Sequence, residues 1–538
     1  MDPIYEQFLK NFQTTNLESC RQLIIQPEFD VNQIFTQHEL NIKLLNFPIK
    51  SSLNVLQLIA RLGKQWASPL ITSILDRGVD IDSLNRDGVT ALIYAAFHSK
   101  MDSSLETVEI LIRAGANINL QDKSGWTALM YASRYLETTS SLETVMTLIR
   151  AGANLDLQTK DGFTALMLAS NLSEKTSSLE TVMTLIRAGA NLDLQTKDGW
   201  TALMLASLHS KTDSSLETVM TLIQAGANLD LQDKDGFTAL MLASLHSKTD
   251  SSLETVMTLI QAGANLDLQD KDGFTALMLA SRQSKTNSSL ETIEALILAR
   301  ANLDLQQKDG WTALMYASRH SKTDSSLETV EALIQARANL DLQNLDGWTA
   351  LMMASRYSKT DSSLETVEAL IRDGANLDLQ DKDGWTALML ASRQSKTDSS
   401  LETVEALIQA GANLDLQNRE DETALILASI YTDNTSSLET VETLVQARAN
   451  LDLQDKSGRT ALMLIVENLD TSRSHETVKT LIQAGADLDL RNNEGCTALR
   501  LAIVNSNTDS SLEMVETLIQ VGANLRLSKR NLAIPPHV

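Results

Sequence analysis

The stretch DKDGFTALMLASLHSKTDSSLETVMTLIQAGANLDLQ, residues 233–269, decides the fold, because the chain between residues 85 and 528 consists of close copies of it. Thr238, in the TAL triplet of this stretch, has a counterpart every 37 residues from Thr90 to Thr497. Twelve copies of 37 residues account for all 444 positions of that span. A fixed period of this length predicts a solenoid, whose units bury their apolar faces only against their neighbours.

The first half of each copy predicts one short helix followed by a loop. Thr238 stands directly before the apolar run 239–244, where its hydroxyl can accept a hydrogen bond from the first turn of a helix. Residues 247–251 are all polar, so we expect them to form a loop that does not bury itself.

The second half of each copy predicts a longer helix and a turn. Ser251 and Glu254 have the Ser-x-x-Glu spacing of a capping box, in which both side chains satisfy backbone donors at the helix start. Apolar residues follow at helical spacing, and Gly263 stands past the last of them, where a left-handed residue ends a helix. The alternating segment 265–269 and the turn 270–273 lead into the next copy.

This pattern resembles a known family. DKDGFTALMLAS followed by LETVMTLIQAGANLDLQ is similar to the ankyrin repeat, whose pattern runs D-x-x-G-x-T-P-L-H-x-A-A and then E-V-V-x-L-L-L-x-x-G-A-x-V-N. The resemblance implies an all-α repeat fold, an ankyrin solenoid of helix-loop-helix units joined by extended β-turn fingers. It also implies a non-catalytic scaffold that mediates protein–protein interaction.

The copies depart from the family in three consistent ways. Ala239 stands where the family has Pro, Met241 stands where it has His, and the loop between the helices is longer. Loss of the His is expected to remove a hydrogen bond that ties the turn in the family. The long repeat is also similar in style to the ankyrin arrays of giant viruses that infect amoebae, which implies a viral or parasite protein acting on host proteins.

The chain is expected to divide into three parts. Residues 1–84 are interpreted as diverged N-terminal capping repeats with an insertion at 33–50, because helix and turn patterns recur on both sides of that segment. Residues 85–528 hold the twelve repeats, and residues 529–538 are expected to be a C-terminal tail. A solenoid grows in one dimension, so the array is expected to be one elongated domain.

Composition limits the classes of partner. The formal net charge of -24 argues against nucleic acid, whose binders present a basic face. Cys20 and Cys496 lie at opposite ends of the array, which favours a reducing compartment. No apolar run is long enough to span a membrane and the first residues do not resemble a secretion signal. We expect a soluble, cytoplasmic monomer, in the host cytoplasm if the protein is viral.

No pattern typical of a catalytic or metal site is present. His98, His209, His246 and His320 share one position of the repeat, but equivalent positions in stacked repeats are a whole unit apart and cannot hold one zinc ion. The sequence has no Gly-rich phosphate loop, GxSxG or HExxH motif. We therefore predict no enzymatic activity, no cofactor and no metal.

One of the two variable positions directly precedes each Thr of the triplet. It is aromatic in successive copies at Trp126, Phe163, Trp200, Phe237, Phe274, Trp311, Trp348 and Trp385. By resemblance this position lies on the protruding turn with which ankyrin proteins contact partners, and aromatic residues are common in binding hot spots. The alternative is that each ring packs on the neighbouring turn.

The other variable position ends the first helix and is arginine in four successive copies: Arg282, Arg319, Arg356 and Arg393. By resemblance the first helix lines a groove, where these side chains could recognise acidic partners. The second helix changes in step, from Met146, Met183, Met220 and Met257 to Glu294, Glu331, Glu368, Glu405 and Glu442. That coincidence favours pairing of arginine with glutamate inside the chain.

The sequence therefore predicts a protein-binding surface where the two variable positions coincide. Its residues are Trp311, Trp348, Trp385, Arg282, Arg319, Arg356 and Arg393. The expected partner is an unidentified protein, and these arginines favour an acidic one. The alternatives are a structural, self-associating array and an enzyme with an unrecognised site.

Overall fold

The computed structural model describes residues 3–14, 16–30, 34–35, 53–62, 68–98, 103–134, 139–171, 176–208, 213–247, 250–285, 288–431, 435–467, 472–504 and 509–521. The predicted tail and all but two residues of the predicted insertion lie outside these ranges. Two compact units are present, Met1–Lys271 and Asp272–Val538, and each is considered by itself.

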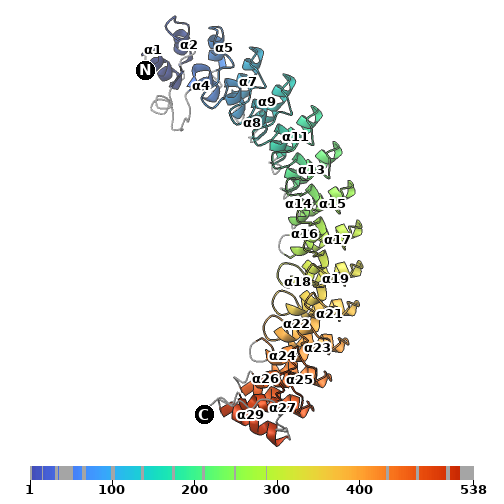
Figure 1. Cartoon of the computed structure of the whole chain (residues 1–538). Helices are drawn as coiled ribbons and strands as arrows, with labels where there is room; N and C mark the ends of the chain where they lie inside the picture. Colours follow the sequence, from blue (N-terminus) through green and yellow to red (C-terminus); the bar gives the residue numbers. More distant parts are fainter. Residues whose placement is uncertain are drawn as a thin grey trace. The chain divides into compact units, whose positions relative to one another are not determined.

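Unit one contains paired helices and one short strand pair (Figure 1). Its helices are α1 (Pro3–Gln13), α2 (Leu17–Ile24), α4 (Val55–Leu62), α5 (Ser68–Leu75), α6 (Ala91–Phe97), α7 (Ser103–Arg113), α8 (Ala128–Arg134), α9 (Thr139–Arg150), α10 (Ala165–Ser170), α11 (Thr176–Arg187), α12 (Ala202–Leu208), α13 (Asp213–Gln224), α14 (Ala239–Leu245) and α15 (Asp250–Gln261). Strand β1 (Ile34–Phe35) pairs antiparallel with β2 (Leu53–Asn54). From α6 onward, the short first helices pack on one another in one row and the second helices form a parallel row.

Unit two continues the same pattern. Its helices are α16 (Ala276–Arg282), α17 (Leu290–Leu298), α18 (Ala313–Arg319), α19 (Leu327–Gln335), α20 (Ala350–Arg356), α21 (Leu364–Arg372), α22 (Ala387–Gln394), α23 (Leu401–Gln409), α24 (Ala424–Ile430), α25 (Leu438–Gln446), α26 (Ala461–Glu467), α27 (Ser472–Gln483), α28 (Ala498–Val504) and α29 (Asp509–Gln520). The core lies between the two rows, where Leu351, Met352, Val367 and Leu370 are buried. The all-helical repeat predicted from the sequence is thus confirmed, with the β1–β2 pair as the addition.

The first helices of the described repeats are capped by threonine as predicted, and in three of them a methionine adds a second bond. The Thr349 hydroxyl accepts a hydrogen bond from the Met352 backbone N–H at 3.2 Å. The backbone N–H of Thr349 in turn donates to the Met352 sulfur at 3.5 Å, and the corresponding bonds join Thr127 to Met130 and Thr164 to Met167. In these repeats the thioether, at the position of the family's His, accepts a hydrogen bond from the threonine N–H.

Each finger is pinned to the next one. In unit two the Leu345 N–H donates to the Asp309 carbonyl at 2.8 Å. The Gln343 side-chain amide donates both to the Gly347 carbonyl in its own finger and to the Gln380 carbonyl in the following one, at 2.7 and 2.9 Å. These bonds recur in every junction of this type, which gives the fingers a fixed spacing within each unit.

The second helices do not begin with the predicted capping box. Helix α15 starts at Asp250, so Ser251 already lies inside the helix. In α17, α19, α21, α23 and α25 of unit two the cap is the second serine of the pair, as at Ser326 in α19, which accepts from the Thr329 N–H at 3.2 Å. The first serine, Ser325, is buried instead. Threonine rather than glutamate stands at the third helical position, which shifts the cap by one residue. Helix α29 of the same unit begins at Asp509, as α15 begins at Asp250.

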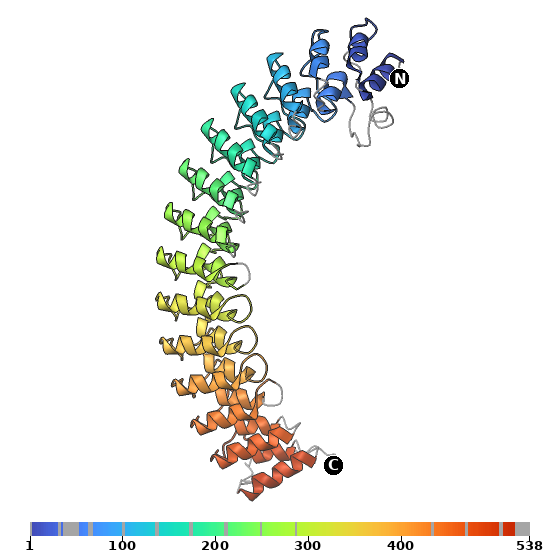
Figure 2. The same ribbon diagram turned by 180° about the vertical axis from the view of Figure 1, so that it is seen from behind.

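The loops between the helices of unit two are partly buried, contrary to expectation. The Ser284 hydroxyl lies 3.1 Å from that of Ser325 in the next loop and accepts from the Thr329 hydroxyl at 2.7 Å. The Lys285 N–H donates to the Asp324 carbonyl at 2.9 Å. Figure 2 shows the loops of this unit as arches, yellow to orange, beside the helices. Polar residues bury here because each loop supplies the hydrogen-bond partners of its neighbour.

Candidate partner-binding surface

The fingers of unit two place the predicted tryptophans at their base, half-buried. The N–H of Trp348 donates to the Asn344 carboxamide oxygen at 2.8 Å, and that of Trp385 donates to Asp381 Oδ1 at 2.8 Å. The Trp311 ring packs on the Tyr316 ring with centroids 4.9 Å apart. Each of these three tryptophans is therefore partly packed against the array and partly exposed to solvent.

The predicted arginines lie against aromatic rings. The guanidinium carbon of Arg282 is 5.8 Å from the Tyr316 ring centroid, and that of Arg319 is 3.3 Å from Tyr357. Such contacts stabilise by about 0.5 to 1 kcal/mol when exposed. The aromatic column and its neighbouring tyrosines thus hold the arginine column in place.

Arg356 and Arg393 each lie between two rings. The Arg356 guanidinium carbon is 5.5 Å from the Trp348 ring centroid and 5.2 Å from Tyr357. For Arg393 the corresponding distances are 5.2 Å to Trp385 and 4.6 Å to Tyr431. Arg356 therefore lies between two rings of its own repeat, whereas Arg393 lies between Trp385 of its own repeat and Tyr431 of the next one.

The pairing with helix-two glutamates that the sequence favoured is not formed. Within the described residues, the ion pair of this arginine column joins Arg319 to Asp361, 3.2 Å apart, in the loop of the next repeat. None of the described arginines of the column pairs with Glu294, Glu331, Glu368, Glu405 or Glu442. The guanidinium groups lie on ring faces of the helix-one side, whereas the glutamates stand on the second helices.

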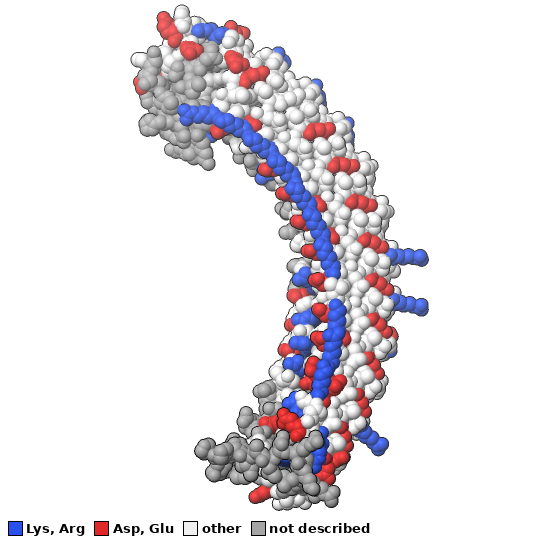
Figure 3. Space-filling view, in the orientation of Figure 1, with Lys and Arg blue, Asp and Glu red and all other residues white. Residues whose placement is uncertain are grey.

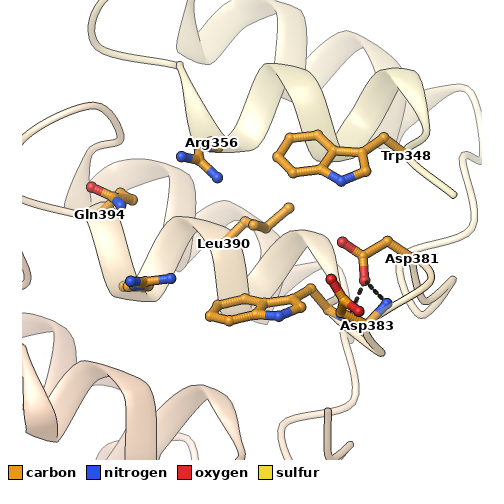
Figure 4. A pocket seen from close by; sticks show the side chains of 8 residues that line it. Trp348, Arg356, Asp381, Asp383, Leu390 and Gln394 are labelled. Atoms are coloured by element: carbon orange, nitrogen blue, oxygen red, sulfur yellow. Dashed lines mark hydrogen bonds between the residues drawn. The ribbon is translucent and has the colours of Figure 1, made fainter. Parts of the chain in front are cut away.

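A pocket of about 200 Å³ brings four of the predicted residues together (Figure 4). It is lined by Trp348, Arg356, Asp381, Asp383, Trp385, Leu390, Arg393 and Gln394. Figure 4 shows Arg356 and Gln394 at one end, Asp381 and Asp383 at the other, and Leu390 between them. The remaining predicted residues, Trp311, Arg282 and Arg319, do not line it.

The acidic residues of the pocket already have partners. Asp381 Oδ1 accepts from the N–H groups of Asp383 and Trp385, at 2.9 and 2.8 Å. Burial raises the pKa of Asp381 above its ordinary value, although these bonds and one from the Trp348 side chain oppose the rise. The Asp383 carboxylate pairs with Arg419 at 3.4 Å.

The basic residues of the pocket lack such partners. Nε of Arg356 and Nε of Arg393 are both buried without a hydrogen-bond partner. Arg393 donates a hydrogen bond to the Tyr431 hydroxyl at 3.4 Å through another nitrogen. Within the described residues neither guanidinium forms an ion pair. The lining therefore contains two guanidinium groups and two carboxylates that are not paired with one another.

Outside the pocket, basic and acidic side chains balance along the fingers. Lys308 lies 3.9 Å from Asp272 of the preceding finger, and Lys456 lies 3.4 Å from Glu420, both largely exposed. Figure 3 shows the basic side chains as blue rows with red side chains beside them. Four finger junctions of the described residues thus carry an exposed ion pair: Lys234–Asp198, Lys308–Asp272, Arg419–Asp383 and Lys456–Glu420.

Sequence reasoning missed several residues of this surface. Leu345 is 56% exposed at a finger tip where the neighbouring repeats carry Lys308 and Lys382. A leucine between repeats that carry lysine at this position can be recognised from the sequence alone. Asp381 and Leu390 gave no such signal, because similar residues occupy their positions in most repeats.

The histidine column shows no metal-binding arrangement. Burial, followed by the charge of Arg319, lowers the pKa of His320 below its ordinary value. His209 lies outside the described residues. Among the residues that the structure places, no group of three or more His, Cys, Asp or Glu side chains could hold a metal ion. None of the helices in this part of the chain is both long enough and apolar enough to cross a membrane.

Comparison with known proteins identifies the family. The family model for ankyrin repeats in three copies matches residues 56–150, 137–215, 208–288, 283–363, 358–455 and 430–529. No curated protein matches the chain. A crystal structure at 1.00 Å resolution of an ankyrin repeat domain from Acinetobacter baumannii AYE is 31% identical, covering 39% of this chain and 98% of that one, with a TM-score of 0.34. Because the matched segments overlap and run from residue 56 to residue 529, the chain belongs to the ankyrin-repeat family.

Proposed function

We propose that the protein is a non-catalytic scaffold that binds another protein through an aromatic–arginine strip in unit two. The strip consists of Trp311, Trp348, Trp385, Arg282, Arg319, Arg356 and Arg393. Ankyrin repeats are generally protein-interaction modules, and this strip is where the present repeats depart from copies of one another. The observation that carries the proposal is the pocket between two of its tryptophans, with two unpaired arginines beside it.

The strip has the physical character of a binding surface. Its tryptophan rings already have packing partners, Tyr316 for Trp311, Arg356 for Trp348 and Arg393 for Trp385, so less side-chain freedom remains to be lost on binding. Tryptophan and arginine are also the residue types most enriched in binding hot spots. Leu345, exposed at the tip of the finger that carries Trp348, adds apolar surface next to the strip.

The test compares two matched triple variants in affinity capture followed by mass spectrometry. A variant with Trp311, Trp348 and Trp385 changed to Ala is expected to lose a partner that the native protein captures, since a hot-spot aromatic contributes about 2 kcal/mol or more. The control changes Trp126, Phe163 and Trp200 of unit one, and is expected to keep the partner. Equal capture by both variants contradicts the proposed location. Circular dichroism checks that each remains folded, and unfolding of the first would assign the tryptophans to packing.

The cellular setting is proposed as the cytoplasm, where the protein acts as a monomer. The resemblance of the long repeat to arrays of giant viruses makes host proteins the first partner class to screen. Self-association is the competing function, and light scattering after size-exclusion chromatography distinguishes it. A mass above one chain that reverts to a monomer in the Trp311, Trp348 and Trp385 variant would support self-association instead.

A further inference from the structure

We infer that the pocket between Trp348 and Trp385 binds the carboxylate of an acidic side chain presented by an extended segment of a protein partner. The inference rests on the proposed function, because it assigns a ligand chemistry to one part of the aromatic–arginine strip. In the part of the chain that the structure describes, two arginines of the pocket lack an ion pair, and its two acidic residues have other partners. The pocket has the size of one side chain, and aromatic rings lie against both guanidinium groups.

The arginines of the pocket differ from the arginine that precedes them in the column. Arg319 pairs with Asp361, which lies 42 residues further along the chain. The corresponding residue for Arg393 is Thr435, which has no charge and donates its hydroxyl proton to the Arg393 carbonyl at 2.7 Å. For Arg356 it is Asp398, and the described residues show no ion pair between the two. Two adjacent guanidinium groups are thus left without a carboxylate.

The acids at the other end of the pocket limit the charge of the ligand. Asp381 accepts hydrogen bonds from backbone N–H groups and Asp383 pairs with Arg419, and within the described residues neither forms an ion pair with Arg356 or Arg393. Both still repel a second negative charge brought close to them. A carboxylate, which carries one charge, suits this balance better than a phosphoryl group, which carries nearly two at neutral pH.

The dimensions fit one side chain. At about 200 Å³ the pocket is smaller than the roughly 300 to 1,000 Å³ typical of cofactor and drug sites. Leu390 and the two indole rings supply apolar contact for the methylene groups of a glutamate or aspartate. The carboxylate of that side chain then contacts Arg356 and Gln394, whose side chains can donate hydrogen bonds to it.

The guanidinium groups are already positioned for this contact. Each lies near two aromatic rings, at 5.5 and 5.2 Å for Arg356 and at 5.2 and 4.6 Å for Arg393. Arginine held in this way loses less rotamer freedom when it binds a carboxylate, and its planar fork matches the two oxygens.

The experiment uses the full chain labelled with 5-fluorotryptophan and follows its fluorine NMR resonances. Resonances of Trp348 and Trp385 are assigned from single Trp-to-Phe variants. A short acetylated peptide with one glutamate flanked by leucines is titrated in, and a second peptide carries glutamine in place of the glutamate. We expect the glutamate peptide to shift both resonances and to bind about tenfold more tightly than the glutamine peptide, because the charged hydrogen bonds are lost in the second.

Variants make the test specific to the two arginines. The double variant Arg356→Gln and Arg393→Gln should weaken binding of the glutamate peptide about tenfold. Arg134→Gln is the matched control, since Arg134 holds the same position in unit one and lies 5.8 Å from the Trp126 ring centroid. It should leave the affinity unchanged. An unaltered resonance of Trp311, which lies in the same unit but outside the pocket, shows that this unit of the double variant is folded.

Three outcomes would overturn the inference: equal binding of both peptides, undiminished binding by the double variant, or shifts produced by a phosphoserine peptide but not by the glutamate peptide. The proposed function is judged separately. If the arginine double variant still captures a cellular partner that the triple tryptophan variant loses, the scaffold stands and the carboxylate pocket fails. If no cellular partner is captured at all, the titration still decides the pocket.

Discussion

Residues 245–261 of unit one and 319–335 of unit two have almost the same sequence but different structures. They differ at three positions, where Leu245, Met257 and Thr258 are replaced by Arg319, Glu331 and Ala332. Yet α15 begins at Asp250 and has 12 residues, whereas α19 begins at Leu327 and has 9. The same segment DSS joins the helix in α15 but lies in a stacked loop before α19, and in α29 of unit two it again joins the helix. The sequence that these repeats share therefore does not decide where the second helix starts.

The neighbouring repeats explain the difference. In unit two the Arg319 guanidinium reaches Asp361 in the following loop, and the Lys322 N–H donates to the Asp361 carbonyl at 3.0 Å. Leucine at the position of Arg319, as in Leu208 and Leu245, cannot form such an ion pair. Arg282 forms no ion pair with Asp324, although the loop containing Asp324 is also non-helical. The arginine column thus supports a loop form that stacking between neighbouring loops already favours.

The largest effect is expected where the two units are alike, at the finger glycines. A Cβ on Gly347, whose φ is +85°, would stand 2.8 Å from the Asp381 Cα of the next finger. Gly347→Val is expected to lower the free energy of unfolding by about 2 to 5 kcal/mol, because a branched side chain is both strained there and in collision with the backbone. Urea denaturation followed by circular dichroism measures the loss.

The matched substitution in unit one is Gly236→Val, for which the corresponding distance to Asp270 Cα is 2.7 Å. The two variants should lose stability to a similar extent. A loss at only one of them would show that the finger junctions, and not just the loops, differ between the units.

An intermediate effect is expected where one repeat of unit two and one of unit one differ in the residue that follows helix two. Arg337 follows α19 with φ of 66°, whereas Gly263 occupies the same position after α15 with φ of 89°. The predicted left-handed conformation is thus confirmed, and a side chain there costs about 1 kcal/mol. Arg337→Gly should raise the denaturation midpoint accordingly. The reverse change, Gly263→Arg, should lower it, and a rise in that case would mean that the cation is favoured at the helix end.

The smallest effect on stability tests the loops directly. Arg319→Leu removes an ion pair whose side chains are 21% and 35% exposed, so the loss is expected to be about 1 kcal/mol or less. Amide hydrogen exchange in residues 357–363 should become faster, while that of residues 394–400 should not change. Unchanged exchange in both loops would show that loop stacking alone sets the form.

Much of the fold could be predicted from the sequence because the signals lie close together along the chain. Thr349 caps α20, which starts at the next residue, and Arg337 lies just past the end of α19. The start of α19 could not be predicted, because it depends on Ser325 being buried against Ser284, 41 residues earlier. Period and capping residues describe one repeat, whereas the loop form is a property of neighbouring repeats.

The candidate site follows the same division. Trp348, Trp385, Arg356 and Arg393 could be selected because their positions vary among copies, and the structure brings them around one pocket. The partner of Arg319 was assigned incorrectly, since the change from methionine to glutamate on the second helices suggested pairing. Only the loop geometry shows that Asp361 lies within reach.

The methionine at the third position of nine first helices gives those repeats built-in chemical probes. Met130, Met167, Met204, Met241, Met278, Met315, Met352, Met389 and Met463 are each 1% exposed, whereas Met220 and Met257 are 39% and 41% exposed. A dilute oxidant should therefore convert the two surface methionines to sulfoxide at once and reach each of the nine buried methionines only when its own repeat opens. The order in which these buried methionines oxidise gives the order in which the repeats open.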